Sequence, residues 1–325
     1  MNEPTPPSKL VESLFGASEV CICTHEEPDG DCVASSLALG SALERRGTRV
    51  NHCNVGPFDR REIKHFADEF KQEVPGHVQR NTTIPIVVLD CSSAARIGAL
   101  KEQITDHRVL VIDHHYTGGT FGDERWVVPE SPSTTYLVQL IMEAAGIPPT
   151  EDEANLLLFG FSTDTGFFRH LAPEQGFAFH GVARLSGYGA SPKGAYARMF
   201  GGRTLESRRL IGTLLSRLSG YFDNRLLISW ETAEDTNAVG KENRDSDAFY
   251  QLAFSIETCE ALILLRQESP EKCTGSLRSY SRIDVSRVAE QFGGGGHKNA
   301  AGFLAEGTPD TLIPKLVEAL APQFE

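Results

Sequence analysis

The stretch THEEPDGD at residues 24–31 lies between an apolar run, 20–23, and a segment of helical periodicity, 32–46. This order predicts a buried strand, a loop and a helix, an arrangement that is typical of α/β proteins. Loops between strand and helix in such proteins usually carry the functional side chains. We therefore expect the chemistry of this protein to be built around the loop.

The loop holds one imidazole, His25, and two carboxylates, Asp29 and Asp31. Pro28 and Gly30 bend the backbone, so the three side chains can converge. Nitrogen and oxygen donors of this kind suit a borderline or hard divalent cation. In the alternative interpretation the loop is only a polar turn in which Asp31 caps the helix, and this stretch alone leaves both interpretations open.

Polar residues also end two further apolar runs. The runs 84–90 and 108–113 are apolar at nearly every position and finish in aspartate, and two histidines follow the second aspartate. Strands that are apolar throughout are covered on both faces, which predicts a parallel sheet. An apolar helix over 154–161 leads to Asp164, a carboxylate that needs a partner or a ligand at that place.

These positions give five carboxylates and three imidazoles at the ends of predicted elements: His25, Asp29, Asp31, Asp90, Asp113, His114, His115 and Asp164. The set is too large for one zinc ion with three protein ligands. Carboxylates packed together ionise only where cations neutralise them, and four aspartates balance two divalent ions. A pair of metal ions is suited to in-line displacement at phosphorus.

The bulk properties narrow the function further. The formal charge of −13, from 44 acidic and 31 basic residues, argues against a long polyanion on a broad basic face but allows a short anionic substrate. The seven cysteines form no CxxC pair, so we expect neither structural zinc nor a disulfide framework. No apolar stretch is long enough to span a membrane, and the polar N-terminus does not resemble a signal peptide, so we expect a cytoplasmic protein.

The length of 325 residues suggests two domains. Glycines and prolines interrupt the helical pattern at 187–202, where we place the domain boundary. The expected division is a metal-binding catalytic domain at 1–190, a linker with a helix at 191–220, and a smaller substrate-binding domain at 221–325. In the last of these, two strands form a predicted hairpin, and the run GGGGHK follows a short helix.

Taken together, these motifs resemble a known family. Its successive motifs match His25-x-x-Pro28-Asp29-Gly30-Asp31, Asp90, Asp113-His114-His115 and Asp164-Thr165-Gly166-x-Phe168-Arg169. This set resembles the DHH phosphoesterases, and GGGHKxAAG at 294–302 resembles the associated DHHA1 domain. The pair is most similar to the bacterial bifunctional oligoribonuclease and pAp phosphatase (nanoRNase) family. The resemblance implies an α/β fold, with a parallel sheet covered by helices on both faces, a linker helix and a smaller C-terminal domain with a mixed sheet.

The resemblance also implies roles for the site residues. One metal would be held by His25, Asp29 and Asp90, and the other by Asp31, Asp90, His114 and Asp164. The usual metal is Mn²⁺, with Mg²⁺ as the alternative. Asp90 would bridge the two ions, Asp113 would orient an imidazole, and His115 would face the phosphoryl oxygens. Substrate contacts would come from Arg278, Gly294, Gly295, Gly296, His297, Lys298 and Arg169, the last of which is equally well explained by an ordinary ion pair.

The activity that the resemblance implies is hydrolysis of RNA oligomers of two to five nucleotides and removal of the 3′-phosphate of pAp. Related alternatives are a phosphodiesterase for pApA or cyclic di-AMP and a RecJ-like single-strand exonuclease. The alternative that is not an enzyme is a regulator that binds nucleotides without hydrolysing them. We expect no membrane partner, and the resemblance leaves a homodimer open.

Overall fold

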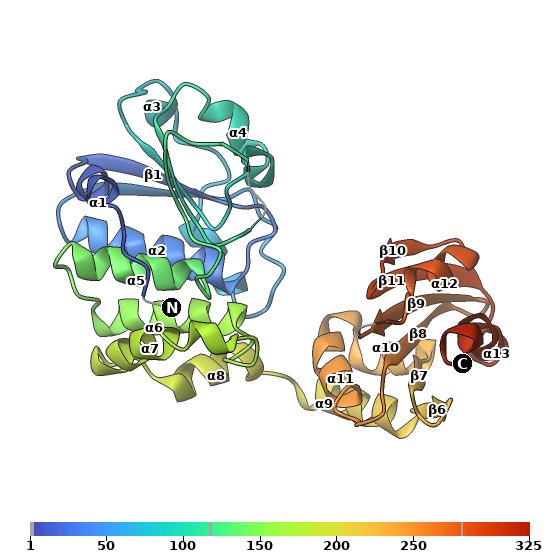
Figure 1. The fold of residues 1–325 in the computed structure, drawn as a ribbon. Coiled ribbons are helices and arrows are strands. Elements are labelled where there is room, and N and C mark those ends of the chain that lie inside the picture. The colour runs from blue at the N-terminus through green and yellow to red at the C-terminus, as the bar shows by residue number, and fades with distance from the viewer. Residues whose placement is uncertain (1–2, 117–118, 281) are drawn as a thin grey trace. The chain divides into compact units, whose positions relative to one another are not determined.

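The computed structural model divides into two compact units, Met1–Gly202 and Arg203–Glu325 (Figure 1). The residues that it describes are 3–116, 119–280 and 282–325. The segment 191–220, where we expect a linker, contains α8 (Pro192–Phe200) in the first unit and α9 (Leu205–Ser216) in the second.

The first unit is built on a five-stranded sheet of order β2-β1-β3-β4-β5, and every neighbouring pair of strands is parallel. The strands are β1 (Glu19–Thr24), β2 (Arg49–Cys53), β3 (Ile86–Leu89), β4 (Val109–Asp113) and β5 (Glu124–Val127). After β2 the chain crosses back to the other side of β1, so the strand order reverses between β1 and β3. Parallel sheets bind ligands at such a reversal, beyond the carboxyl ends of the strands.

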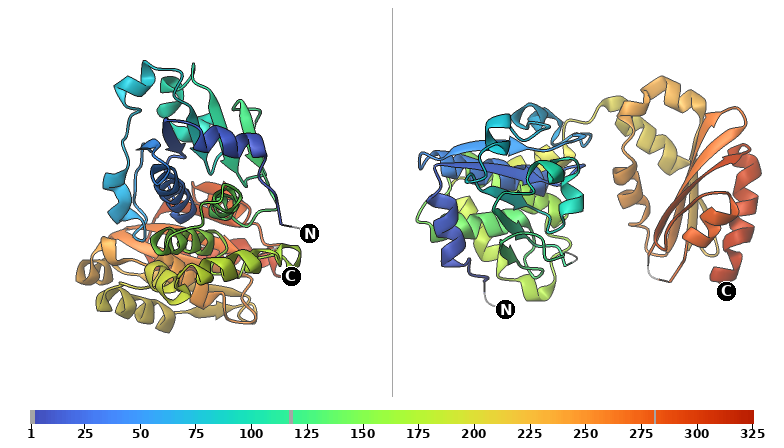
Figure 2. Two further views of the ribbon diagram at one scale, coloured as in Figure 1. Left: turned by 90° about the vertical axis from the view of Figure 1, so that its left-hand side faces the viewer. Right: turned by 90° about the horizontal axis from the view of Figure 1, so that it is seen from above.

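Helices cover both faces of this sheet, as the apolar strands predict. Val20 and Ile22 share one hydrophobic cluster with α2 and α5, whereas Cys21 and Cys23 on the opposite face share another with α3 and α4. On the first face, α2 and α5 lie between the sheet and a further layer that contains α6 and α7 (Figures 1 and 2). The helices are α1 (Ser8–Phe15), α2 (Gly30–Glu44), α3 (Gly76–Gln79), α4 (Leu100–Gln103), α5 (Thr134–Ala144), α6 (Glu151–Asp164) and α7 (Ala178–Gly187).

The segment 60–70 has the sequence pattern of a charged amphipathic helix, but only a 3₁₀ segment, Lys64–Glu69, forms there. Contacts with a distant part of the chain oppose a longer helix here. Lys71 accepts a hydrogen bond from the N–H of Asn54 and donates one to the carbonyl of His52, which extends the backbone beside β2. By contrast, Thr150 and Glu153, whose spacing in the sequence matches a capping box, form one at the start of α6.

The second unit contains a six-stranded sheet of order β10-β11-β9-β8-β7-β6. Only β7 and β8 are parallel, so the sheet is mixed, and the α/β fold class inferred from the sequence is confirmed. The strands are β6 (Ser219–Tyr221), β7 (Leu226–Glu231), β8 (Ala261–Ser269), β9 (Lys272–Ser279), β10 (Gly295–His297) and β11 (Ala300–Glu306). The predicted hairpin is β8–β9.

Helices pack on both faces of the second sheet (Figure 2). One face carries the cluster of α12 and α13, and the other carries the cluster of α9 and α11. The helices are α10 (Ala233–Val239), α11 (Ser246–Ala253), α12 (Ser286–Gln291) and α13 (Pro309–Leu320). None of the helices in the described segments has the length and apolar character that crossing a bilayer requires.

Candidate metal centre

The carboxyl ends of β1, β3 and β4 meet at one edge of the first sheet. The register pairs Thr24 with Leu89 and Leu89 with Ile112. The polar residues that end or follow the three strands are therefore neighbours, and they are His25, Asp90, Asp113, His114 and His115. The sheet thus brings together residues that lie far apart in the sequence.

Asp90 sits in a strained backbone conformation at this edge. Its φ is 63°, in the left-handed region that costs L residues roughly 1–2 kcal/mol. Its carboxylate is buried, and Oδ1 accepts a hydrogen bond from the hydroxyl of Thr134 at 2.9 Å. Strain of this kind is typical of functional positions, where it fixes the direction of a side chain.

The loop after β1 supplies two carboxylates with different surroundings. Asp29 is the N-cap of α2, and its Oδ1 accepts the backbone N–H of Cys32 at 3.0 Å. Asp31 lies in the first turn of the helix and is fully buried. The capping residue is therefore Asp29, not Asp31 as the alternative interpretation of the loop supposed.

The start of α5 holds Asp31 in place. Its Oδ2 accepts the backbone N–H of Thr134 at 2.6 Å, and its Oδ1 accepts both the N–H and the hydroxyl of Thr135, at 2.8 and 2.6 Å. The motifs that mark the site in the sequence do not include these threonines. The signal that reveals them is a Ser-Thr-Thr run at a helix start, where free N–H groups attract a carboxylate.

His114 lies among three carboxylates. Its Nε2 is 2.9 Å from Oδ2 of Asp164, 3.6 Å from Oδ1 of Asp90 and 3.9 Å from Oδ2 of Asp31. The other ring nitrogen, Nδ1, lies 3.2 Å from the carbonyl oxygen of Ser131 and donates its proton there. Nε2 is thereby directed towards the carboxylates, where it is buried without a well-formed hydrogen bond.

Asp164 reaches this group from the last residue of α6. The C-terminal end of a helix carries partial negative charge, so a carboxylate there is unfavourable unless a positive group balances it. In the described chain, the imidazole of His114 lies at the right distance to do so.

The pKa values of the clustered groups show that their negative charges need to be neutralised. Burial and the charge of Asp164 raise the pKa of Asp31 to about 7. Burial and the charges of Asp31 and Asp29 raise the pKa of Asp90 well above its usual value. Burial lowers the pKa of His114, but the carboxylate of Asp164, 2.9 Å from Nε2, and the charges of Asp31 and Asp90 raise it to about 10. Protons or cations must therefore neutralise this site.

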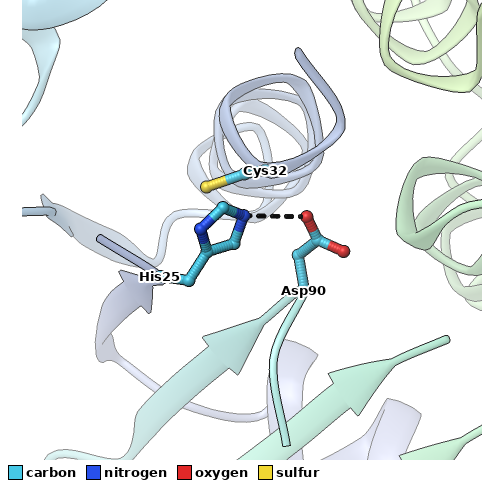
Figure 3. A group of neighbouring side chains, drawn as sticks. All are labelled: His25, Cys32 and Asp90. Carbon is cyan, nitrogen blue, oxygen red and sulfur yellow. Dashed lines mark ion pairs between the residues drawn. The ribbon is translucent and has the colours of Figure 1, made fainter. Parts of the chain in front are cut away.

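Three groups of side chains present ligand atoms that lie within 4.8 Å of one another. They are His25 with Cys32 and Asp90, then Asp90 with His114 and His115, and finally Asp31 with His114 and Asp164. Figure 3 shows the first group, in which His25 faces Asp90 across 3.4 Å. Asp90 and His114 each belong to two groups. Clustered imidazoles and carboxylates, with a buried ring nitrogen left over, fit divalent cations.

Asp113 and His115 form a hydrogen-bonded pair at the edge of this cluster, where Nδ1 of His115 also lies 3.7 Å from Oδ1 of Asp90. Oδ1 of Asp113 accepts the ring Nδ1–H of His115 at 2.7 Å and the backbone N–H groups of His114 and His115 at 2.8 and 3.1 Å. Burial raises the pKa of Asp113, but these hydrogen bonds outweigh it and hold the pKa below its usual value. The ionised carboxylate therefore fixes the turn of the double histidine and leaves Nε2 of His115 directed away from Asp113.

The remaining predicted site residues lie elsewhere. Asp29 is outside the three groups of ligand atoms found among the described residues. Arg169 is exposed in the turn after α6 and donates from Nε to the carbonyl of Gly166 at 2.9 Å. The others are in the second unit, and they are Arg278 on β9, Gly294 just before β10, Gly295, Gly296 and His297 on β10, and Lys298 in the turn that follows.

The glycine run is partly an edge strand, not only a loop. A Cβ on Gly294 would lie 2.1 Å from the carbonyl oxygen of Gly302, and one on Gly296 would lie 2.6 Å from that of Ala300. These two glycines are needed because β10 packs closely on β11. Gly295 has open space around it, so its backbone is the part of the run that a ligand can approach.

Two family models and several curated proteins match this chain. The N-terminal domain of the DHH family matches residues 19–161, and the DHHA1 domain matches residues 236–324. The bifunctional oligoribonuclease and PAP phosphatase NrnA of Thermus thermophilus is 30% identical over 97% of this chain and 94% of its own length. The cyclic-di-AMP phosphodiesterase PdeA of Listeria monocytogenes is 24% identical over 96% of this chain but 48% of its own.

Solved structures show the same fold. An exopolyphosphatase-related protein from Bacteroides fragilis superposes with a TM-score of 0.75 at 24% identity, over 98% of this chain and 97% of that one. The exonuclease RecJ bound to manganese gives a TM-score of 0.53 at 17% identity, over 98% and 92% of the two chains. With both domains matched and a relative aligned over nearly its full length, the chain belongs to the DHH/DHHA1 family of phosphoesterases, which use divalent metal ions.

Proposed function

We propose that this protein is a two-metal phosphohydrolase that degrades RNA oligomers of two to five nucleotides to mononucleotides and converts pAp to AMP. The observation that carries the proposal is the placement of Asp90. This one buried carboxylate belongs both to the group around His25 and to a group around His114. The activity named for the NrnA relative, which aligns over almost the whole of both chains, supports the choice of substrate.

In this proposal the cations are divided between two neighbouring positions. His25, Asp29 and Asp90 hold one ion, and Asp31, Asp90, His114 and Asp164 hold the other. We propose Mn²⁺ as the native metal, with Mg²⁺ as the alternative. Bound divalent cations supply Lewis-acid stabilisation of charge on the phosphoryl oxygens and make water a better nucleophile.

The chain's own residues contribute positioning and hydrogen bonds. Asp113 accepts the Nδ1–H of His115, which sets the ring so that Nε2 is free to donate to a phosphoryl oxygen when the imidazole is protonated. Thr134 and Thr135 keep Asp31 and Asp90 in fixed rotamers. A fixed carboxylate loses little entropy when it binds a cation, so the site is preorganised.

The second unit supplies the contacts for an anion. Arg278 lies on β9, and its guanidinium stacks 5.3 Å from the centre of the Tyr250 ring, which limits its rotamers. His297 and Lys298 are exposed at the β10 edge. We propose that Arg278, His297 and the backbone of Gly295 bind a terminal phosphate of the substrate, with Lys298 adding positive charge there.

Substrate competition tests the proposal. Purified protein is treated with chelator, reloaded with Mn²⁺, and given pAp, pApA, cyclic di-AMP and RNA of two to ten nucleotides, each alone and in mixtures. We expect release of phosphate from pAp and of mononucleotides from the shortest RNA, and no release without metal.

The other outcomes separate the alternatives. A preference for pApA or cyclic di-AMP would replace the proposal with the dinucleotide phosphodiesterase. Cleavage of long single strands at equal or greater rate would favour a RecJ-like exonuclease. Binding of nucleotides without turnover on any of these compounds would favour a regulator.

A further inference from the structure

Cys32 lies inside the candidate metal centre, although the metal-ligand motif of the family supplies only imidazole and carboxylate there. It is the third residue of α2 and is fully buried. Its sulfur, a ring nitrogen of His25 and a carboxylate oxygen of Asp90 all lie within 4.8 Å of one another. Figure 3 shows the thiol directed from the helix towards the edge of the His25 ring.

The orientation of the His25 ring favours metal binding on the side that faces Asp90. Its Nδ1 lies 2.7 Å from the carbonyl oxygen of Glu26, which can only accept a hydrogen bond, so Nδ1 carries the proton. The lone pair is then on Nε2, which lies 3.4 Å from Oδ2 of Asp90. Two donors that bind one tetrahedral cation at about 2.0–2.2 Å lie about 3.3–3.6 Å apart, so this pair already has the required spacing.

The other cysteines have no such surroundings. All seven are free and buried, but Cys32 is the one that falls into a group of potential metal ligands among the described residues. The N-cap, Asp29, uses Oδ1 to accept the N–H of Cys32, which fixes the first turn of α2 and with it the position of the thiol.

We propose that Cys32 is a ligand to the cation held by His25 and Asp90, and that its sulfur gives this position a higher affinity for thiol-seeking divalent cations such as Zn²⁺, Co²⁺ and Cd²⁺ than imidazole and carboxylate alone would give. The inference rests on the proposed two-metal site and extends its ligand set. A sulfur donor raises affinity for softer cations far more than for Mn²⁺, and a thiol that binds a metal gives up its proton to solvent.

Cobalt provides the direct test, because a thiolate bound to Co²⁺ gives a charge-transfer absorption in the near ultraviolet and carboxylates and imidazoles do not. The full chain, freed of metal by chelator, is titrated with Co²⁺ while the spectrum and the number of bound ions are recorded. We expect two ions per chain and a charge-transfer band in the wild type. The Cys32→Ser variant should bind Co²⁺ without the band, and the matched control Cys273→Ser, which changes another buried thiol in the second unit, should keep it.

The results separate this inference from the proposed function. Two bound Co²⁺ ions without the band in the wild type, or a band that persists in Cys32→Ser, would overturn the role of Cys32 and leave the two-metal site standing. Failure to bind Co²⁺ at all would overturn both. If Cys32→Ser does not fold, the Cys32→Ala variant takes its place, and absence of the band in the wild type would still overturn the role of Cys32.

Calorimetry gives a second measure of the same ligand. We expect Cys32→Ser to weaken Cd²⁺ binding about 10- to 100-fold and to change Mn²⁺ binding less than about threefold. Equal changes for the two metals would show that the residue acts only through packing.

Discussion

Arg278 and His297 lie in one row of the second sheet, with only Ala300 between them. Arg278 is paired with Ala300 across β9 and β11, and Ala300 is paired with His297 across β11 and β10. Residues paired directly across antiparallel strands point to the same face. The methyl group of Ala300 leaves space between a guanidinium and an imidazole that are two strand spacings, about 9–10 Å, apart.

This row predicts how Arg278→Ala will behave. Loss of a charged hydrogen bond to a substrate phosphate should raise KM for pAp about 10- to 100-fold and lower kcat much less. Steady-state kinetics of phosphate release measures both. Lys272→Ala is a suitable control, because Lys272 lies at the other end of β9 and pairs with Glu306. An unchanged KM in Arg278→Ala would remove Arg278 from the proposed substrate site.

Asp90→Asn should abolish turnover without unfolding the protein. Asparagine tolerates the left-handed backbone at this position. Its amide oxygen can accept the Thr134 hydroxyl, and its amide nitrogen can donate to Nε2 of His25. What is lost is the charge that two cations would share, so we expect activity to fall at least about 10³-fold. Phosphate release and circular dichroism measure the two effects, and wild-type turnover would refute the bridging role.

The same variant should change how stability depends on pH. The raised pKa of Asp90, like that of Asp31 at about 7, means that the folded state holds these protons more tightly than the unfolded state does. These bound protons therefore increase the free energy of unfolding. The increase is fully present below a pH of about 4, and the contribution of Asp31 to it is lost as the pH rises through about 7.

In chelator, the Tm of wild type should therefore fall relative to that of Asp90→Asn as pH rises from 4 to 8, since the variant cannot ionise at residue 90. Each kcal/mol corresponds to about 2–4 °C for a domain of this size. Mn²⁺ should raise the Tm of wild type more at pH 8 than at pH 5, because cations then replace the missing protons. The exposed residue Asp106 provides the control, Asp106→Asn, whose Tm should follow wild type at each pH.

Asp113→Asn should affect catalysis more than binding. The amide oxygen can still accept the three hydrogen bonds that Asp113 receives, but without the negative charge these hydrogen bonds are weaker and hold the His115 ring less firmly. We expect kcat to fall about 10- to 100-fold, with KM changed much less, as measured by steady-state kinetics of phosphate release.

A double-mutant cycle with His115→Ala distinguishes this role from a general loss of stability. If Asp113 acts through His115, the double variant should be little worse than His115→Ala alone. Additive losses would show that the carboxylate supports the site in another way.

Thr135→Val tests the support of Asp31. Removing the hydroxyl that donates to Oδ1 of Asp31 leaves the side-chain volume nearly unchanged. Mn²⁺ affinity, measured by calorimetry, should fall about 10-fold because outer hydrogen bonds orient metal ligands. Thr105→Val, an exposed position outside the site, should bind Mn²⁺ as wild type does.

Much of the fold could be predicted because its pattern is local. The apolar runs before Asp90 and Asp113 predict parallel strands, and residues that end parallel strands must meet at one edge. The mixed sheet of the second unit is predicted only by the family resemblance, because no local pattern in the sequence shows which of its strands run parallel.

The features of the site that the sequence does not predict depend on contacts between distant segments. Thr134 and Thr135 look like an ordinary helix start until α5 is placed beside the loop that carries Asp31. Cys32 looks like a small apolar residue until the first turn of α2 is placed beside His25. Likewise, nothing near the glycine run shows that Gly294 and Gly296 lie against β11.

The order of segments in the first unit has a consequence for how the protein acquires activity. The loop after β1 is synthesised early, whereas Asp164 stands at the end of α6, which packs on α2 only after all five strands have been made. A nascent or truncated chain that stops before α6 lacks one side of the cluster around His114. The candidate metal centre is therefore completed only once α6 has been made and has packed on α2.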